Sequence, residues 1–212
     1  MKEPCERLLS RPLRPADGID MARLSAAEQR LGLSLPSALR ELYTCAGSVP
    51  CLMESFQRFS APEQLAIEDG KLVFLEENQG VCFWGVEIAG DRSTVWQRAN
   101  EDSPWYSEDV ELEEFVRIVL YYQCAQGGYG HVAAVGLEQP ELLELLAVRW
   151  EKVVEHSGLH IYWQPDVLIW WLEESQRRCR LHFPFRTHTR VLRALRRRVR
   201  ARRIMSLIVR QR

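Results

Sequence analysis

Apolar residues recur at helical spacing in the first fifty positions of the chain. Residues 19–31 carry isolated apolar residues among polar ones and are followed by Gly32, a residue type that often ends a helix. A second helix is expected from Pro36, since proline suits a first helical turn, to the residue before Gly47. Residues 1–18 contain three prolines and a glycine, so we expect an irregular lead-in there.

The spacing then changes to that of strands. Three short apolar runs, Leu72–Leu75, Val81–Ile88 and Thr94–Gln97, are separated by short stretches rich in turn-forming residues. Strands this short and this close together in the sequence predict an antiparallel meander.

Helical spacing returns at Val110–Ala125 and again at Pro140–Glu155, and glycine follows each stretch. Two further apolar runs, at 159–163 and 167–172, flank a Gln-Pro-Asp turn and predict a closing hairpin. The order of these elements predicts an α+β fold, in which helices pack on one face of a mainly antiparallel sheet.

Length and composition suggest how the chain is divided. With 212 residues, of which 46% are hydrophobic, the chain is long enough for one domain with its own core and an appendage. We expect a lead-in over residues 1–18, a single domain over 19–173 and an arginine-rich tail over 174–212. The sequence shows no apolar run of 18 residues and no secretory signal, so a cytoplasmic location is expected.

Charge is distributed unevenly between the body and the tail. Residues 177–212 contain 14 arginines and no acid, a net charge of +14. Residues 1–176 contain 14 Lys/Arg and 29 Asp/Glu, a net charge of −15. An acidic body with a basic tail is the most informative feature of the composition.

Three interpretations of the tail remain open. Leu192, Leu195 and Val199 lie at helical spacing, which favours a basic amphipathic helix that contacts nucleic acid or an anionic membrane surface. The second interpretation is a solvated or disordered arm that lies against the acidic body. The third interpretation is that it is not a native part of the domain, as in an out-of-frame extension.

Reactive side chains are scattered rather than gathered in motifs. The six cysteines include no CxxC pair, and no G-x-S-x-G, HExxH or phosphate-binding glycine motif occurs. His156 and His160 are separated by Ser157-Gly158, an expected helix end, and so need not share a helical face. We therefore expect reduced cysteines, no enzymatic activity, and no metal, cofactor or small-molecule substrate.

An acidic stretch lies near the middle of the chain. Residues 101–114 contain seven Asp/Glu and no Lys or Arg, with two large aromatic residues among them. One interpretation is a solvated loop and helix start. The other is a partner-binding patch, because acidic groups steer a basic partner and aromatic side chains anchor interfaces. The residues expected to contact the partner are Glu101, Asp102, Trp105, Tyr106, Glu108, Asp109, Glu111 and Glu113.

The two opening helices also carry a signature. Residues 27–43, AEQRLGLSLPSALRELY, resemble the opening of the SUKH superfamily: a helix with a glutamate, then LG, two residues, LP and a second helix. Residues 77–86 are similar to the family's central strands, and residues 110–125 to its closing helix. The similarity covers about residues 19–128, is weaker over 129–173 and is absent from 174–212.

The resemblance implies a non-catalytic domain that recognises other proteins. Bacterial members typically bind a cognate toxin, often a nuclease or deaminase, and block it, whereas fungal members regulate cell-wall assembly. We therefore expect an immunity protein whose partner is a basic protein toxin. Two alternatives remain open: a regulatory or scaffold protein that binds endogenous partners, and a nucleic-acid binder that acts through its tail.

Overall fold

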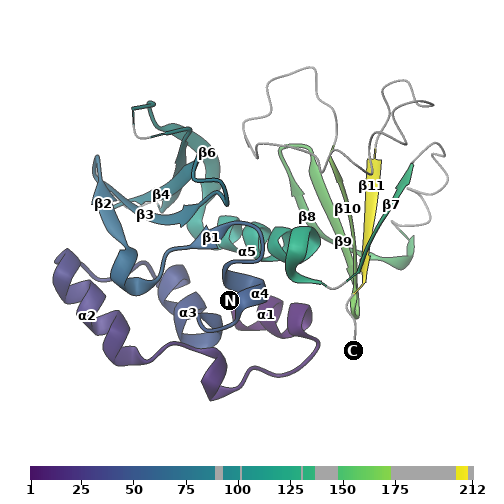
Figure 1. Cartoon of the computed structure of the whole chain (residues 1–212), viewed down its shortest axis with the longest axis horizontal. Helices are drawn as coiled ribbons and strands as arrows, with labels where there is room; N and C mark the ends of the chain where they lie inside the picture. Colours follow the sequence, from purple (N-terminus) through teal and green to yellow (C-terminus); the bar gives the residue numbers. More distant parts are fainter. Residues whose placement is uncertain (89–92, 101, 130, 137–147, 173–203, 210–212) are drawn as a thin grey trace. The chain divides into compact units, whose positions relative to one another are not determined.

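The computed structural model describes residues 1–88, 93–100, 102–129, 131–136, 148–172 and 204–209, with the backbone alone at 131–136 and 204–209. The chain divides into two compact units, Met1–Tyr129 and Gly130–Arg212 (Figure 1). This boundary falls inside residues 19–173, where a single domain was expected. Each unit is described separately below.

The helices of unit 1 lie mainly before its sheet. They are α1 (Lys2–Leu9), α2 (Met21–Leu31), α3 (Ser37–Ala46), α4 (Pro50–Met53) and α5 (Leu112–Gln123). The Asp20 side chain caps α2 by accepting a 2.9 Å hydrogen bond from the backbone N–H of Ala22, and Gly32 ends the helix at φ 69°. The two helices expected from the opening pattern are therefore confirmed.

The prediction of an irregular lead-in over residues 1–18 is wrong at Lys2–Leu9, where α1 forms. Pro4 lies in the first turn of this helix, where proline costs no internal hydrogen bond, so it does not prevent helix formation. Cys5, Leu8 and Leu9 make the buried face of α1. Burial of that face stabilises the helix. The prolines of residues 1–18 had instead indicated an irregular segment.

The sheet of unit 1 is antiparallel throughout its described residues. Its strands are β1 (Arg58–Phe59), β2 (Ala66–Glu68), β3 (Lys71–Glu76), β4 (Phe83–Glu87), β5 (Thr94–Arg98) and β6 (Tyr106–Glu111). Their order is β1-β3-β4-β5-β6, with β2 also paired to β3. The meander expected from the three apolar runs is confirmed.

Helix α5 packs on one face of this sheet. The Phe115 ring lies 6.1 Å from Phe74 of β3 and 6.2 Å from Trp84 of β4, measured between ring centroids, and all three side chains are fully buried. The α+β arrangement expected from the sequence is therefore present. The helix begins two residues later than expected, because Val110 and Glu111 belong to β6.

Unit 2 contains a second antiparallel sheet. Its described strands are β7 (His131–Gly136), β8 (Glu151–His156), β9 (Leu159–Gln164), β10 (Val167–Leu172) and β11 (Ile204–Val209), in the order β7-β11-β10-β9-β8. The hairpin expected from the two apolar runs is confirmed as β9 and β10.

The helix expected over Pro140–Glu155 is wrong from Glu151 onward, where β8 runs. Positions 140–147 lie outside the described residues. Ser157 (φ 47°) and Gly158 (φ 84°) are both left-handed, which is the backbone of a two-residue hairpin turn rather than a helix end.

The tail expected over 174–212 contributes a strand to unit 2. β11 pairs with β10 on one side and β7 on the other. The segment that carries Leu192, Leu195 and Val199 lies outside the described residues, so the three interpretations of the tail stay predictions. Among the helices that the structure describes, none is long and apolar enough to cross a membrane.

Candidate functional site

The outer face of the unit 1 sheet, opposite α5, carries a cluster of cationic and aromatic side chains. Lys71 Nζ lies 4.8 Å from the ring centroid of Trp96 and 5.6 Å from that of Trp105. Arg98 Cζ lies 4.7 Å from the Trp105 ring and 5.8 Å from the Phe83 ring. Each contact falls within the range of a cation–π interaction, so the cations hold the rings in place.

Gly85 of β4 makes room for this cluster. A Cβ atom at this position would lie 3.1 Å from the Cβ of Lys71 and 3.3 Å from Cη2 of Trp105. The absent side chain lets the Trp105 ring lie close to the strand backbone. Trp84, the preceding residue, faces the core, so Gly85 and Trp105 belong to the outer face.

Two acidic side chains lie against the cations. Arg98, which is 5% exposed, forms an ion pair with Glu68, and its guanidinium also lies 3.8 Å from the Asp69 carboxylate. The indole N–H of Trp105 donates a 3.2 Å hydrogen bond to Asp69. We call Glu68, Asp69, Lys71, Phe83, Trp96, Arg98 and Trp105 together the acidic sheet face.

The acidic sheet face presents its negative charge outward. The Asp69 side chain is 73% exposed and that of Glu68 is 40% exposed, whereas that of Arg98 is 6% exposed. Residues 66–114, which span β2 to the start of α5, contain 13 Asp/Glu and 3 Lys/Arg. Solvent therefore meets the two carboxylates and the half-buried Lys71, while the Arg98 charge lies beneath the carboxylates.

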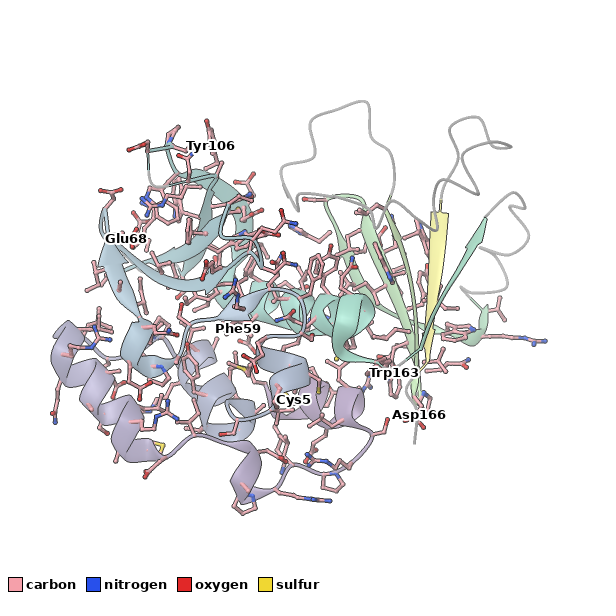
Figure 2. The ribbon with its side chains drawn as sticks, viewed as in Figure 1. Cys5, Phe59, Glu68, Tyr106, Trp163 and Asp166 are labelled. Atoms are coloured by element: carbon pink, nitrogen blue, oxygen red, sulfur yellow. The ribbon has the colours of Figure 1, made fainter. Side chains whose placement is uncertain are left out.

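Of the residues expected to contact the partner, Trp105 is a member of this face. Tyr106 begins β6 and is 63% exposed, and Trp105 is half-buried within the acidic sheet face. Figure 2 labels Glu68 and Tyr106 on the sheet of unit 1, and Phe59 nearer the helices. The exposed acids are Asp102, Asp109, Glu111 and Glu113. Glu101 lies outside the described residues.

Glu108 is a correction to the expected patch. It is 3% exposed and its carboxylate accepts a 2.8 Å hydrogen bond from Trp84 Nε1. Burial raises the pKa of Glu108 to about 7, an effect that the hydrogen bond from Trp84 partly offsets. Glu108 therefore belongs to the core of unit 1 and does not contribute to an exposed patch.

A groove adjoins the acidic sheet face. It has a volume of about 590 Å³, and both Glu68 and Phe83 line it. Tyr43 is one of its lining residues and is fully buried, and its hydroxyl donates a 2.6 Å hydrogen bond to the carbonyl of Ser60. Burial raises the pKa of Tyr43, so this hydroxyl stays protonated and serves as a structural contact.

The charged side chains of the groove are acids and arginines. They are Arg23, Glu54, Arg58, Glu68 and Glu76. Arg23 binds Glu63 through two hydrogen bonds of 2.7 and 2.8 Å.

The histidines noted in the sequence lie in unit 2. His156 and His160 are on neighbouring strands, where Leu159 pairs with His156 and Glu155 with His160. The His160 ring stacks on Trp171 at 5.1 Å, and its Nδ1 lies 3.8 Å from the Glu155 carboxylate. This ring packs within the sheet. Among the described residues, no cluster of three or more His, Cys, Asp or Glu side chains is placed to hold a metal ion.

The sequence pattern alone does not point to Glu68, Asp69, Lys71 or Arg98. Trp96 and Arg98 alternate along one strand, and this spacing could have placed them on one face. Their partners come from β2 and β3, some 25 to 30 positions earlier, and only the strand pairing brings them together.

Comparison of the chain with models of known protein families, with characterised proteins and with solved structures gave no match. The assignment to the SUKH superfamily therefore stays a prediction, and the geometry of the acidic sheet face is the main support for a function.

Proposed function

We propose that the chain is a non-catalytic protein-binding domain, and that its acidic sheet face and the adjoining groove bind a basic protein. On the sequence resemblance, we propose that the partner is a bacterial toxin and that the chain is its cytoplasmic immunity protein. The observation that carries the proposal is the outward display of Glu68 and Asp69 over a buried Arg98 and a fixed Trp105.

Electrostatics favour a cationic partner. Unit 1 has 12 Lys/Arg and 21 Asp/Glu, a net charge of −9, and 13 of these acids lie in residues 66–114. A nuclease needs a basic cleft to hold phosphates, so an acidic surface attracts that cleft and competes with nucleic acid for it. The rate of association then falls as salt screens the charges.

Preorganisation favours tight binding. Trp105 is already held by Lys71, Arg98 and Asp69, so a partner that packs on its exposed edge orders little additional structure. Tyr106 follows it in the chain and is exposed, but its pairing with Gln97 puts its side chain on the opposite side of the sheet. Trp105 is therefore the expected centre of the contact.

The test is co-expression of the full chain with the toxin encoded beside its gene, scored by survival and by complex formation. The test variant carries Asp69→Asn, Asp102→Asn and Glu111→Gln. A control variant with the same change in charge carries Glu3→Gln, Glu151→Gln and Glu155→Gln, three exposed acids elsewhere. Asn at 69 still accepts the Trp105 hydrogen bond, so the fold of the face is retained.

We expect the test variant to lose at least tenfold in affinity and to protect poorly, while the control variant protects as well as the unmodified chain. Equal protection by the two variants would show that the toxin binds elsewhere. Absence of any binding or protection by the unmodified chain would overturn the immunity function and favour a regulatory protein with endogenous partners.

A further inference from the structure

The groove beside the acidic sheet face has a wall that helices of unit 1 hold in place. This wall is the segment that joins β1 to β2. The Tyr43 hydroxyl of α3 donates its 2.6 Å hydrogen bond to the carbonyl of Ser60. Arg30 of α2 donates hydrogen bonds of 3.0 and 2.9 Å to the carbonyls of Pro62 and Leu65. These bonds come from the protein itself, so the shape of the groove does not depend on a ligand.

Apolar side chains make up much of the groove lining. Its volume of about 590 Å³ is enough for a few side chains of a bound protein. Figure 2 labels two of its lining residues, Phe59 and Glu68. An apolar side chain that enters the groove would leave water for an apolar surface, which is the usual source of affinity at the centre of an interface. The apolar lining includes Ile19, Val49, Met53, Phe59, Val73 and Phe83.

The charges of the groove leave carboxylates available to a cation. Arg23 is engaged by its pair with Glu63, and Arg58 donates a 2.7 Å hydrogen bond to a backbone carbonyl. In the part of the chain that the structure describes, no ion pair or side-chain hydrogen bond engages Glu54 or Glu76. These two carboxylates outweigh the single charge of Arg58, so the lining favours a positive group.

We propose that the groove binds a short segment of the basic partner, in which an apolar side chain enters the recess and a neighbouring lysine or arginine meets Glu54 and Glu76. The inference rests on the proposed function, because it names what that partner presents to the groove. Glu68 and Phe83 belong both to the acidic sheet face and to the groove lining, so the two surfaces are continuous. A protein that covers the face therefore also covers part of the groove.

The two surfaces then have different roles in binding. Exposed charges mainly set the rate of association, and any basic protein meets the same attraction. An enclosed apolar contact mainly sets the rate of dissociation, and only a protein with the matching segment makes it. The groove is therefore the part of the interface that selects among basic proteins.

The experiment titrates the full chain, isotope-labelled at its methyl groups, with short peptides and follows the NMR signals of Met53 and Val73. The probe is the tripeptide Lys-Phe-Lys with both ends blocked, and the reference peptides are Glu-Phe-Glu and Lys-Ser-Lys. We expect Lys-Phe-Lys to shift both methyl signals and to bind about tenfold more tightly than either reference. The first reference lacks the positive charge, and the second lacks the apolar side chain.

Two variants test the two parts of the groove. Ser48→Trp places a large side chain at an exposed lining position and is expected to abolish the shifts. Its control is Ser37→Trp, which is exposed and outside the groove and is expected to keep them. Glu54→Gln with Glu76→Gln is expected to weaken the binding of Lys-Phe-Lys about tenfold, because the carboxylates are gone.

The control for the charge change carries Glu3→Gln and Glu151→Gln, two exposed acids elsewhere, and is expected to bind as the unmodified chain does. The methyl spectrum of each variant without peptide shows whether it is folded. If Ser48→Trp does not fold, the glutamine variant and the comparison of the three peptides still give the answer.

Equal binding of Lys-Phe-Lys and Glu-Phe-Glu, or shifts that spare Met53 and Val73, would overturn the inference. Shifts of the same signals that grow with protein concentration in the absence of peptide would also overturn it, because a second copy of the chain would then occupy the groove.

The toxin of the co-expression test separates this inference from the proposed function. Ser48→Trp is expected to raise the rate of toxin dissociation about tenfold and to change the rate of association little. If the toxin binds the unmodified chain and Ser48→Trp equally well, the groove inference fails and the proposed function stands. If no toxin binds but Lys-Phe-Lys does, the proposed function fails and the groove remains a site for basic, apolar segments.

Discussion

The indole N–H of Trp84 donates a 2.8 Å hydrogen bond to the buried carboxylate of Glu108. The bond joins β4 to β6, two strands that β5 separates, so it lies on the core side of the sheet. It also places an ionisable group within the core, on β6, the strand that begins with the exposed Tyr106. The ionisation of Glu108 therefore affects the stability of the strand that supports the candidate interface.

The stability of unit 1 is predicted to fall as pH rises through neutrality. Burial raises the pKa of Glu108 from 4.5 to about 7, so the folded state favours the protonated carboxyl. The resulting stabilisation is complete below about pH 4.5 and is lost as pH rises through 7. Glu108→Gln, a permanently neutral substitute, is expected to be more stable than the unmodified chain at pH 8 by about 1–3 kcal/mol.

Urea denaturation of the two proteins from pH 4 to pH 8 measures this difference. Asp109 and Cys82, which interact electrostatically with Glu108, are the same in both proteins. Parallel stability curves over the whole range would show that Glu108 does not titrate near neutrality.

The contributions of Arg98 and Glu68 to the stability of unit 1 are predicted to be strongly coupled. Glu68→Gln leaves the Arg98 guanidinium, 5% exposed, without its nearest negative charge, and is expected to cost about 1–3 kcal/mol. Adding Arg98→Met removes the buried charge and is expected to restore part of that loss. A double-mutant cycle by chemical denaturation is expected to give a coupling energy of at least about 1 kcal/mol, whereas additive effects would contradict this account.

A larger residue at position 85 is predicted to lower the stability of unit 1, and the loss is expected to grow with the size of the side chain. Valine has a high strand propensity, so Gly85→Val would stabilise β4 if the site were open. We expect instead a loss of about 1–3 kcal/mol, because the new side chain would overlap the space of Trp105 and Lys71. Thermal unfolding measures the loss. Gly85→Ala, with a single added carbon, is the control and is expected to lose less.

The Ser157-Gly158 turn offers a test of the hairpin in unit 2. Both residues have positive φ, and asparagine adopts this backbone more readily than serine. Ser157→Asn is therefore expected to raise stability by a few tenths of a kcal/mol, and Gly158→Ala to lower it by about 1 kcal/mol. If residues 151–157 were helical, asparagine would bring no gain.

Local signals in the sequence determined several elements correctly. Gly32 marks the end of α2, and short apolar runs between turns mark β3, β4, β5 and the β9–β10 hairpin. These signals depend on residues that are neighbours in the chain, because caps, turns and side-chain periodicity act over a few positions. The α+β class follows from their order.

Tertiary packing decided the elements whose local signals point elsewhere. The prolines near α1 indicated a loop, yet its apolar face is buried in unit 1. The acids of β6 indicated a helix start, yet the strand pairs with β5, and one of its acids, Glu108, is buried. The apolar residues near Val153 fit helical spacing, but the turn at Ser157 pairs β8 with β9.

The candidate sites depend most on tertiary structure. The sequence by itself established that residues 101–114 are acidic and aromatic, and that the cysteines are scattered. Strand register brought Glu68, Lys71, Arg98 and Trp105 onto one face. Contacts between residues far apart in the chain are set by how whole elements pack, and that packing minimises the free energy of the entire unit rather than of any single segment.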